Sequence, residues 1–353
     1  MKLLLVSSSF PPDVYGSTQN QFKEIYLHAR ENYQTRLITG WHHARSLIPP
    51  EAISIQYNQK QRMQNWKLLY ELVRSETKTW NPDIVLLNNL FFPRMSTPRI
   101  IRIQKYPFNE NQMRNWIHKR WMLSTLTNKD AIVTTNKQQS QLLIQDGVQP
   151  SQLYSIPNGV SMYDGYPPRK TQKIHILCPA SISPSKNQHI VIEAFARLRT
   201  KFRKRCILNI VGHTKDKAYL DRLRIQAYEL PVRFILAPKD MKQHYQEADI
   251  VLLPGIHKHY VSLSAQEAMA SGSATIWVET MCSRQFFHSL GVPTPPKDIN
   301  RLVKILEDLI QNPERRETIG RELRAEAEKK YSWKNIWSSY EEILNVIYHK
   351  TWI

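Results

Sequence analysis

The sequence predicts an α/β protein with two Rossmann-like doubly wound domains, each built on a parallel sheet. Short apolar runs alternate with amphipathic helical patterns along all 353 residues. This alternation is typical of parallel sheets with helices on both faces. A turn-rich segment, from Pro157-Asn158-Gly159 to Tyr166-Pro167-Pro168, separates two sets of expected strands. At roughly 100–200 residues per domain, the length also suits two domains, which we place at 1–160 and 161–332.

The apolar runs give the expected strands. The first set comprises 2–7, 34–38, 84–88, 100–103, 131–135 and 153–156. The second set comprises 174–179, 206–211, 232–236, 250–253 and 274–278. Helices are expected between many of them, at 19–30, 138–145, 190–200, 218–227 and 264–270, and an amphipathic, aromatic-rich helix at 333–348. Ligands of such folds bind at the carboxyl ends of the strands, so we expect a ligand cleft between the domains.

Composition excludes several classes of protein. Hydrophobic residues make up 41% and charged residues 22%, as in a folded globular protein. The 3 cysteines have no CxxC spacing, which argues against a disulfide framework or a zinc site. No apolar run is long enough for a membrane helix or a signal-peptide core, so we expect a cytoplasmic protein. The net charge of +19 suits an anionic partner: a phosphorylated substrate, an acidic membrane surface or a nucleic acid.

Three segments that follow expected strands contain candidate binding residues. The first, residues 10–17, has Gly16 where a backbone could approach a phosphate, although an ordinary turn explains it as well. The second has Lys186 at a helix start, as a diphosphate ligand or a solvated lysine. The third, 257–272, places Ser262 and Ser264 at the start of a helix with Glu267 in its first turns. His257 and His259 are better explained as a surface pair than as metal ligands.

The order of several motifs resembles the family-4 retaining glycosyltransferases, which have the two-domain glycosyltransferase-B (GT-B) fold. Phe10-Pro11-Pro12…Gly16 resembles the FPPxxGG loop of that family, and 156–160 reads IPNGV. Ile182…Lys186-Asn187 resembles its GRLxxxKG segment, and 208–212 matches its LxIVG strand. Residues 248–254 and 267–272 resemble its ADVFVLP…EAMAxG pattern. The resemblance implies that the terminal helix, 333–353, packs back on the first domain.

This resemblance implies transfer of a sugar from a nucleotide diphosphate sugar, UDP- or GDP-linked, to a hydroxyl of a glycan, glycolipid or other glycoconjugate, with retention at the anomeric carbon. It implies no cofactor and no required metal. Lys186 takes the place of the pyrophosphate lysine and Glu267 that of the ribose-binding acid. The remaining implied donor contacts are Gly16 and the amides near Ser262, Leu263 and Ser264. The inner face of the membrane is an open alternative for its location.

At several other positions, a different residue stands where the family has its typical one. His259 stands where the first acid of the E-x7-E element is expected, and Gln104 where a sugar-contacting histidine is expected. We expect both to contact the transferred sugar. Ser181 replaces a pyrophosphate arginine. These changes leave open a second interpretation, a catalytically impaired glycosyltransferase-like binding or scaffold protein. The net charge leaves open a third, a glycosyltransferase that acts on nucleic acid.

Two basic clusters have two interpretations each. The first comprises Arg94, Arg99, Arg102, Lys105, Arg114, Lys119 and Arg120, with aromatic residues between them. It is either a surface for an anionic lipid, membrane or nucleic acid, or a solvated helix face. The second, Arg197–Arg205, lies at a helix end, where the helix dipole favours cations, so a structural role is expected.

Overall fold

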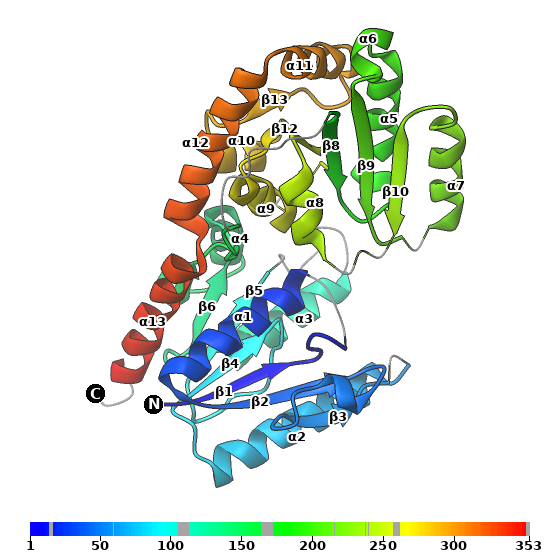
Figure 1. Ribbon diagram of the computed structural model, residues 1–353. Helices are drawn as coiled ribbons and strands as arrows, with labels where there is room; N and C mark the ends of the chain where they lie inside the picture. Colours follow the sequence, from blue (N-terminus) through cyan, green and yellow to red (C-terminus); the bar gives the residue numbers. More distant parts are fainter. Residues whose placement is uncertain are drawn as a thin grey trace. The chain divides into compact units, whose positions relative to one another are not determined.

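The structure is a computed structural model and divides by its internal contacts into two compact units (Figure 1). One unit comprises Met1–Gly159 and Trp333–Ile353, and the other comprises Val160–Ser332. The residues that the structure describes are 1–13, 17–58, 60–104, 113–163, 172–214, 216–236, 238, 240–256 and 262–350. No helix in these described ranges is both long enough and apolar enough to span a bilayer.

The first unit is a seven-stranded parallel sheet with the order β3-β2-β1-β4-β5-β6-β7. Its strands are β1 (Lys2–Ser7), β2 (Gln34–Trp41), β3 (Ile53–Gln56), β4 (Ile84–Asn88), β5 (Arg99–Ile103), β6 (Ala131–Thr134) and β7 (Leu153–Ser155). Its helices are α1 (Ser17–Asn32), α2 (Arg62–Thr79), α3 (Met113–Thr125), α4 (Lys137–Gln145) and α13 (Trp333–Lys350), with 3-10 turns at Arg45–Leu47 and Pro150–Gln152. The short edge strand β3 was not expected from the sequence, because its residues are only partly buried and lack a long apolar run.

Strand side chains of the first unit alternate between two apolar layers, as successive side chains in a strand must. Leu3 and Leu5 of β1 pack with α1 and α13, whereas Leu4 and Val6 pack with α2, α3 and α4. The last helix of the chain therefore completes one face of the N-terminal sheet (Figure 1).

The second unit is a six-stranded parallel sheet with the order β10-β9-β8-β11-β12-β13. Its strands are β8 (Ile174–Pro179), β9 (Cys206–Gly212), β10 (Val232–Leu236), β11 (Ile250–Leu253), β12 (Ala274–Val278) and β13 (Val292–Thr294). Its helices are α5 (Gln188–Arg197), α6 (Thr200–Arg203), α7 (Lys217–Gln226), α8 (Met241–Glu247), α9 (Leu263–Ser271), α10 (Met281–Phe287), α11 (Ile299–Gln311) and α12 (Pro313–Tyr331), with a 3-10 turn at Pro184–Lys186. Strand β13 was not expected, because it has three residues and contains Pro293.

Helices cover both faces of the second sheet. Helices α5, α7 and α11 pack on one face, around Phe195, Leu223 and Leu306. Helices α8, α9, α10 and α12 pack on the other, around Tyr245, Met269 and Leu323. Two parallel sheets, each covered on both faces, confirm the predicted fold class.

The chain passes between the units at Gly159–Val160 and at Ser332–Trp333. In the first unit, the side-chain amide of Gln21 donates to the carbonyl oxygen of Gly159 at 2.7 Å and accepts from its backbone N–H at 2.8 Å. A Cβ on Gly159 would lie 2.5 Å from the Trp333 ring, so only glycine lets this ring pack here. In the second unit, Val160 and Ser332 form a β-bridge. Each of the two connecting segments is therefore held at either end by contacts within the unit to which that end belongs.

Candidate functional site

The candidate site of the second unit lies at the carboxyl ends of β8 and β11. These two strands are neighbours in the sheet, but the chain runs from β8 to β9 on one side and from β11 to β12 on the other. Such a reversal of strand order opens a crevice between the loops that follow the two strands, and open α/β sheets bind ligands there. One loop holds Lys186, and the other leads to α9.

The loop after β8 is fixed by close backbone contacts. Gly212 ends β9, and a Cβ there would lie 2.0 Å from the carbonyl oxygen of Ala180, so the close approach requires glycine. Asn187 adopts a left-handed conformation, with φ of 57°, at the start of α5. Its side-chain amide donates a 3.0 Å hydrogen bond to the carbonyl oxygen of Pro254, just after β11. Lys186 is half-buried beside this junction, which joins the two loops of the crevice.

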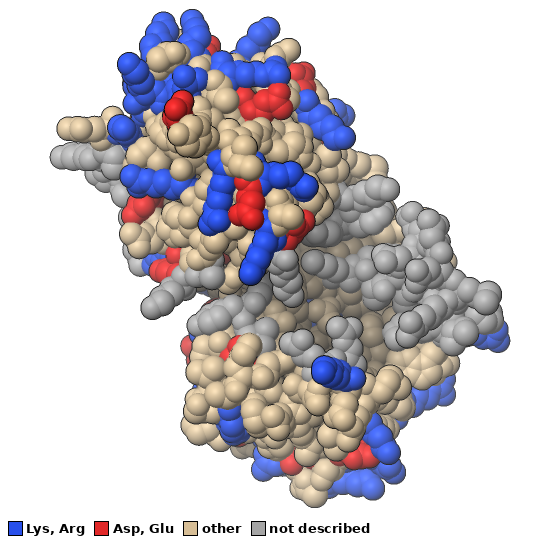
Figure 2. Space-filling model, turned by 90° about the vertical axis from the view of Figure 1, so that its right-hand side faces the viewer, with Lys and Arg blue, Asp and Glu red and all other residues tan. Residues whose placement is uncertain are grey.

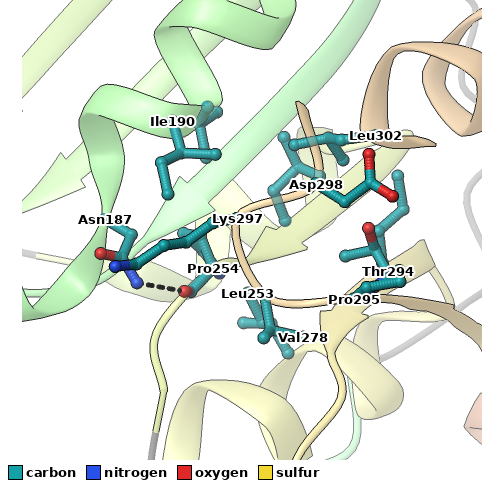
Figure 3. Close-up of a pocket in the computed structure, with 13 residues that line it drawn as sticks. Asn187, Ile190, Leu253, Pro254, Val278, Thr294, Pro295, Lys297, Asp298 and Leu302 are labelled. Atoms are coloured by element: carbon teal, nitrogen blue, oxygen red, sulfur yellow. Dashed lines mark hydrogen bonds between the residues drawn. The ribbon is translucent and has the colours of Figure 1, made fainter. Parts of the chain in front are cut away.

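A pocket opens behind this junction, on the α5 and α11 face of the sheet (Figure 3). Ile190, Leu253 and Val278 supply apolar walls, and Lys297 extends toward Asn187. Thr294 is 4% exposed, and its hydroxyl has no hydrogen-bond partner among the described residues. Helix α9 packs on the opposite face of the sheet, so this pocket does not include the start of that helix.

Helix α9 presents its N-terminus at the same edge of the sheet. Ser262 precedes the helix with extended backbone and makes no side-chain cap. Leu263 and Ser264 are the first helical residues, and both are half-buried. Because the first N–H groups of a helix have no intrahelical acceptor and carry partial positive charge, this end suits a phosphate.

Glu267 lies one turn further along α9 and faces two buried tyrosines. Burial raises the pKa of Glu267, and a hydrogen bond from Tyr245 opposes that rise. Burial and the charge of Glu267 raise the pKa of Tyr163 far above its usual value. The rings of Tyr163 and Tyr245 stack with centroids 6.3 Å apart. Sequence reasoning missed both tyrosines. The only local signal was one aromatic residue, Tyr245, in the short polar segment before the buried strand 250–253.

Two of the predicted site residues, Gly16 and His259, lie outside the described residues. Gln104 lies in the first unit, directly after β5, and is 6% exposed. Its side-chain oxygen accepts a hydrogen bond from Thr18, and its backbone N–H donates to Asn89 at 2.9 Å. The remaining predicted residues, Lys186, Ser262, Leu263, Ser264 and Glu267, all belong to the second unit.

The first unit contains a buried carboxylate that the sequence did not single out. Asp13 is 4% exposed and accepts hydrogen bonds from the backbone N–H groups of His42, His43 and Ala44 at 2.5, 2.8 and 3.2 Å. Burial alone would raise the pKa of Asp13, but these donors outweigh it and the pKa is lowered. Asp13 thus joins the segment after β1 to the segment after β2.

The surface interpretation of the basic cluster at 94–120 fails for the two arginines of β5. Arg99 is 0% exposed and pairs with Asp130 at 2.6 Å. Arg102 is 2% exposed and donates to Asn88 and Asn158 at 3.2 and 2.7 Å. Lys119 pairs with Asp146, while Lys105 and the Arg114 side chain lie outside the described residues. The other described members, Arg94 and Arg120, are exposed, so the surface interpretation rests on these two residues.

The basic side chains of Arg197–Arg205 pair mainly with acidic and carbonyl groups of their own unit. Arg197 pairs with Glu193 and Arg199 with Glu307, at 2.5 and 2.7 Å. Arg203 donates to the carbonyl oxygen of Ala196 near the end of α5, as the helix dipole favours. On the face shown in Figure 2, acidic side chains lie between many of the basic ones. No cluster of three or more potential metal-binding side chains occurs in the described part of the chain.

Comparison with known proteins relates the second unit of the chain to a protein family. Residues 166–326, which include Lys186, Glu267 and all of α9, match the model of the family described as "Glycosyl transferases group 1". These residues form a glycosyl transferases group 1 domain. The curated lipopolysaccharide 1,2-N-acetylglucosaminetransferase of Salmonella typhimurium is 27% identical over 184 residues. That match covers 47% of this chain and 47% of the relative, so the chain matches about half the length of that protein.

Solved structures share the fold of the whole chain, including the group 1 domain. Anabaena HepE in complex with UDP and glucose has a TM-score of 0.77 at 16% identity, over 98% of this chain and 100% of that one. Sucrose-phosphate synthase from Thermosynechococcus elongatus has a TM-score of 0.76 at 16% identity, over 99% of each chain. WaaG, a glycosyltransferase involved in lipopolysaccharide biosynthesis, has a TM-score of 0.71 at 17% identity, over 98% and 99%. The architecture is thus of the GT-B type.

Proposed function

We propose that this protein is a retaining glycosyltransferase that moves a sugar from a UDP-sugar to a hydroxyl of a saccharide acceptor of the lipopolysaccharide kind. The observation that carries the proposal is the switch point in residues 166–326, where the Lys186 loop is hydrogen-bonded through Asn187 to Pro254, just after β11, and α9 is the next helix along the chain. The complexes of HepE with UDP and with UDP-glucose support the choice of UDP. The Salmonella relative supports the acceptor class.

The proposed chemistry follows from the charges that develop during transfer. As the bond between the anomeric carbon and the diphosphate breaks, negative charge grows on the leaving phosphate and positive charge on the sugar ring. The Lys186 ammonium and the N-terminal amides of α9 would stabilise the phosphate, and the amides would do so without reorganisation because the helix already orients them. Glu267 would accept hydrogen bonds from the ribose hydroxyls. No step of this scheme requires a metal ion.

A binding measurement tests the nucleotide site. Lys186→Ala should weaken UDP binding about 10- to 100-fold, because a charge-assisted hydrogen bond contributes roughly 1.5–3 kcal/mol. Calorimetric titration with UDP, GDP, ADP and CMP measures this loss and the base preference. The matched control is Lys204→Ala, an exposed lysine just before β9, at the opposite end of the sheet. Equal UDP affinity of Lys186→Ala and the parent would contradict the site.

Product analysis tests the reaction. Incubation with UDP-sugars and a lipopolysaccharide-core acceptor should give a glycoside whose anomeric configuration, read by NMR, equals that of the donor. Activity should persist with a chelator. UDP binding without product from any sugar would favour the second candidate, a nucleotide-binding protein without transfer. The buried Gln104, already bonded to Thr18, gives that candidate its specific support.

A further inference from the structure

Asn187 lies between the 3-10 turn that contains Lys186 and the first turn of α5. Its backbone has φ of 57° and ψ of 30°, in the left-handed region that most residues with a side chain avoid. Asparagine tolerates this region better than most of them. The turn therefore holds a residue that adopts the required backbone and still carries a hydrogen-bonding side chain, which glycine would lack.

The Asn187 side chain links its loop to the loop after β11. Asparagine is favoured before a helix because its oxygen can cap the first N–H groups, yet Asn187 makes no such bond to α5. Its amide nitrogen donates instead to the carbonyl oxygen of Pro254 at 3.0 Å (Figure 3). A carbonyl oxygen only accepts, so the NH2 group of the amide must be the part that faces it. Since β8 and β11 are the strands on either side of the switch point, this bond crosses it.

Other bonds of the same loop run elsewhere. At its beginning, the N–H of Ile182 donates to the carbonyl oxygen of His213 at 2.7 Å, which holds the loop to the segment after β9. Near its end, the N–H of Lys186 donates to the carbonyl oxygen of Ser183 at 2.9 Å, within the loop itself. Neither bond joins the loop to β11. The bond from Asn187 therefore fixes the loop in a direction that these two do not.

The position of Asn187 makes this bond relevant to Lys186. The two residues are consecutive, so the bond also holds the backbone from which the lysine side chain extends. A lysine ammonium is a point charge at the end of a flexible four-carbon stem, and its reach is set by where that stem begins. A loop without the bond would have to be ordered when a ligand binds, and the lost conformational freedom would weaken binding.

We propose that Asn187 is a positioning residue of the nucleotide site, which holds the backbone of Lys186 against the loop after β11 so that the lysine can reach the diphosphate. This inference rests on the proposed function and adds a residue that acts through Lys186, without contact to the nucleotide. Loss of the Asn187 side chain should then weaken binding of the phosphates and leave binding of the nucleoside unchanged.

The test compares UDP with uridine, which lacks the diphosphate. Asn187→Gly keeps the left-handed backbone and removes the amide donor, and should bind UDP about two- to tenfold more weakly than the parent, as loss of one hydrogen bond implies. The same variant should bind uridine as the parent does. In a Lys186→Ala background, Asn187→Gly should cause less than half of its single-variant loss. Calorimetric titration gives the UDP affinities, and NMR titration gives the weaker uridine affinities.

Glu229→Gly is the matched control for the change of backbone. Glu229 also has a left-handed conformation in the second unit, with φ of 61°, but it is exposed and precedes β10, at the opposite end of the sheet. This substitution relieves the same kind of backbone strain without removing a bond at the crevice. It should leave the affinity for UDP and for uridine unchanged.

The outcomes separate the possible failures. Equal loss of affinity for UDP and uridine in Asn187→Gly would show a merely structural role and overturn the inference alone. Unchanged affinity for UDP would overturn it too, as would an undiminished loss in the Lys186→Ala background. Failure of the parent protein to bind any nucleoside diphosphate would overturn the proposed function, and this inference with it.

Discussion

At the scale of single residues, the environment of a carboxyl group decides the direction of its pKa shift. Asp13 is buried and Glu267 is half-buried, and burial alone would raise the pKa of both, yet their pKa values move in opposite directions. Three backbone N–H groups bond Asp13 and lower its pKa despite burial. Glu267 has one hydrogen bond from Tyr245, and burial outweighs it. The residue type alone therefore says little about protonation, which depends on the number of donors that the fold supplies.

The lowered pKa of Asp13 predicts a contribution to stability that depends on pH. Because the folded pKa lies below the unfolded value of about 3.9, the contribution is present above pH 4 and is lost as pH falls through the folded pKa. In Asp13→Asn, the free energy of unfolding should therefore differ less between pH 7 and pH 3 than in the parent. Urea denaturation at both pH values measures this. Asp221→Asn, at an exposed carboxylate, should keep the parental difference, and an unchanged difference in Asp13→Asn would refute the assignment.

At the scale of elements, α13 shows how a distant segment completes a core. Its buried side chains, among them Trp337, Tyr340 and Leu344, pack with α1 and with strands of the first sheet. The amphipathic pattern of 333–348 predicted the helix, and the family resemblance supplied its partner. The pattern alone could not, because an apolar helix face fits any apolar sheet face of similar shape.

The packing of α13 predicts a specific loss of stability. Leu344 is 0% exposed, so Leu344→Ala should lower the free energy of unfolding of the first unit by about 2–5 kcal/mol, through lost burial and the cavity left behind. Val346 lies on the same helix and is 42% exposed, so Val346→Ala should change it by less than about 1 kcal/mol. Urea denaturation followed by hydrogen exchange in β1 reports on this unit. Equal effects of the two substitutions would contradict the packing.

At the scale of the whole molecule, each unit has its own sheet and its own apolar layers. The described candidate nucleotide contacts all lie in the second unit, whereas Gln104 and Asp13 lie in the first. The two units can therefore respond differently to a nucleotide.

This division predicts where a nucleotide stabilises the protein. UDP at about 100 times its dissociation constant should add about 2.7 kcal/mol to the unfolding free energy of the unit that binds it. Hydrogen exchange should then slow in β8, β9 and β11, and much less in β1 and β4. GDP or CMP, if not bound, serves as the control at the same concentration. Slower exchange confined to the first unit would place the nucleotide site there.

The sequence by itself determined the fold class, most of the strands and the loops after β8 and β11. Those features are local, because the period of apolar residues and the turn residues lie within a few positions of one another. The short edge strands β3 and β13 were not predicted, because they are too short to show a periodic pattern of apolar residues. The tertiary structure decided the rest: that Arg99 and Arg102 are buried, and that the rings of Tyr163 and Tyr245 stack. Burial and pairing depend on which segments the sheet order brings together, and residues distant in sequence carry no local record of that order.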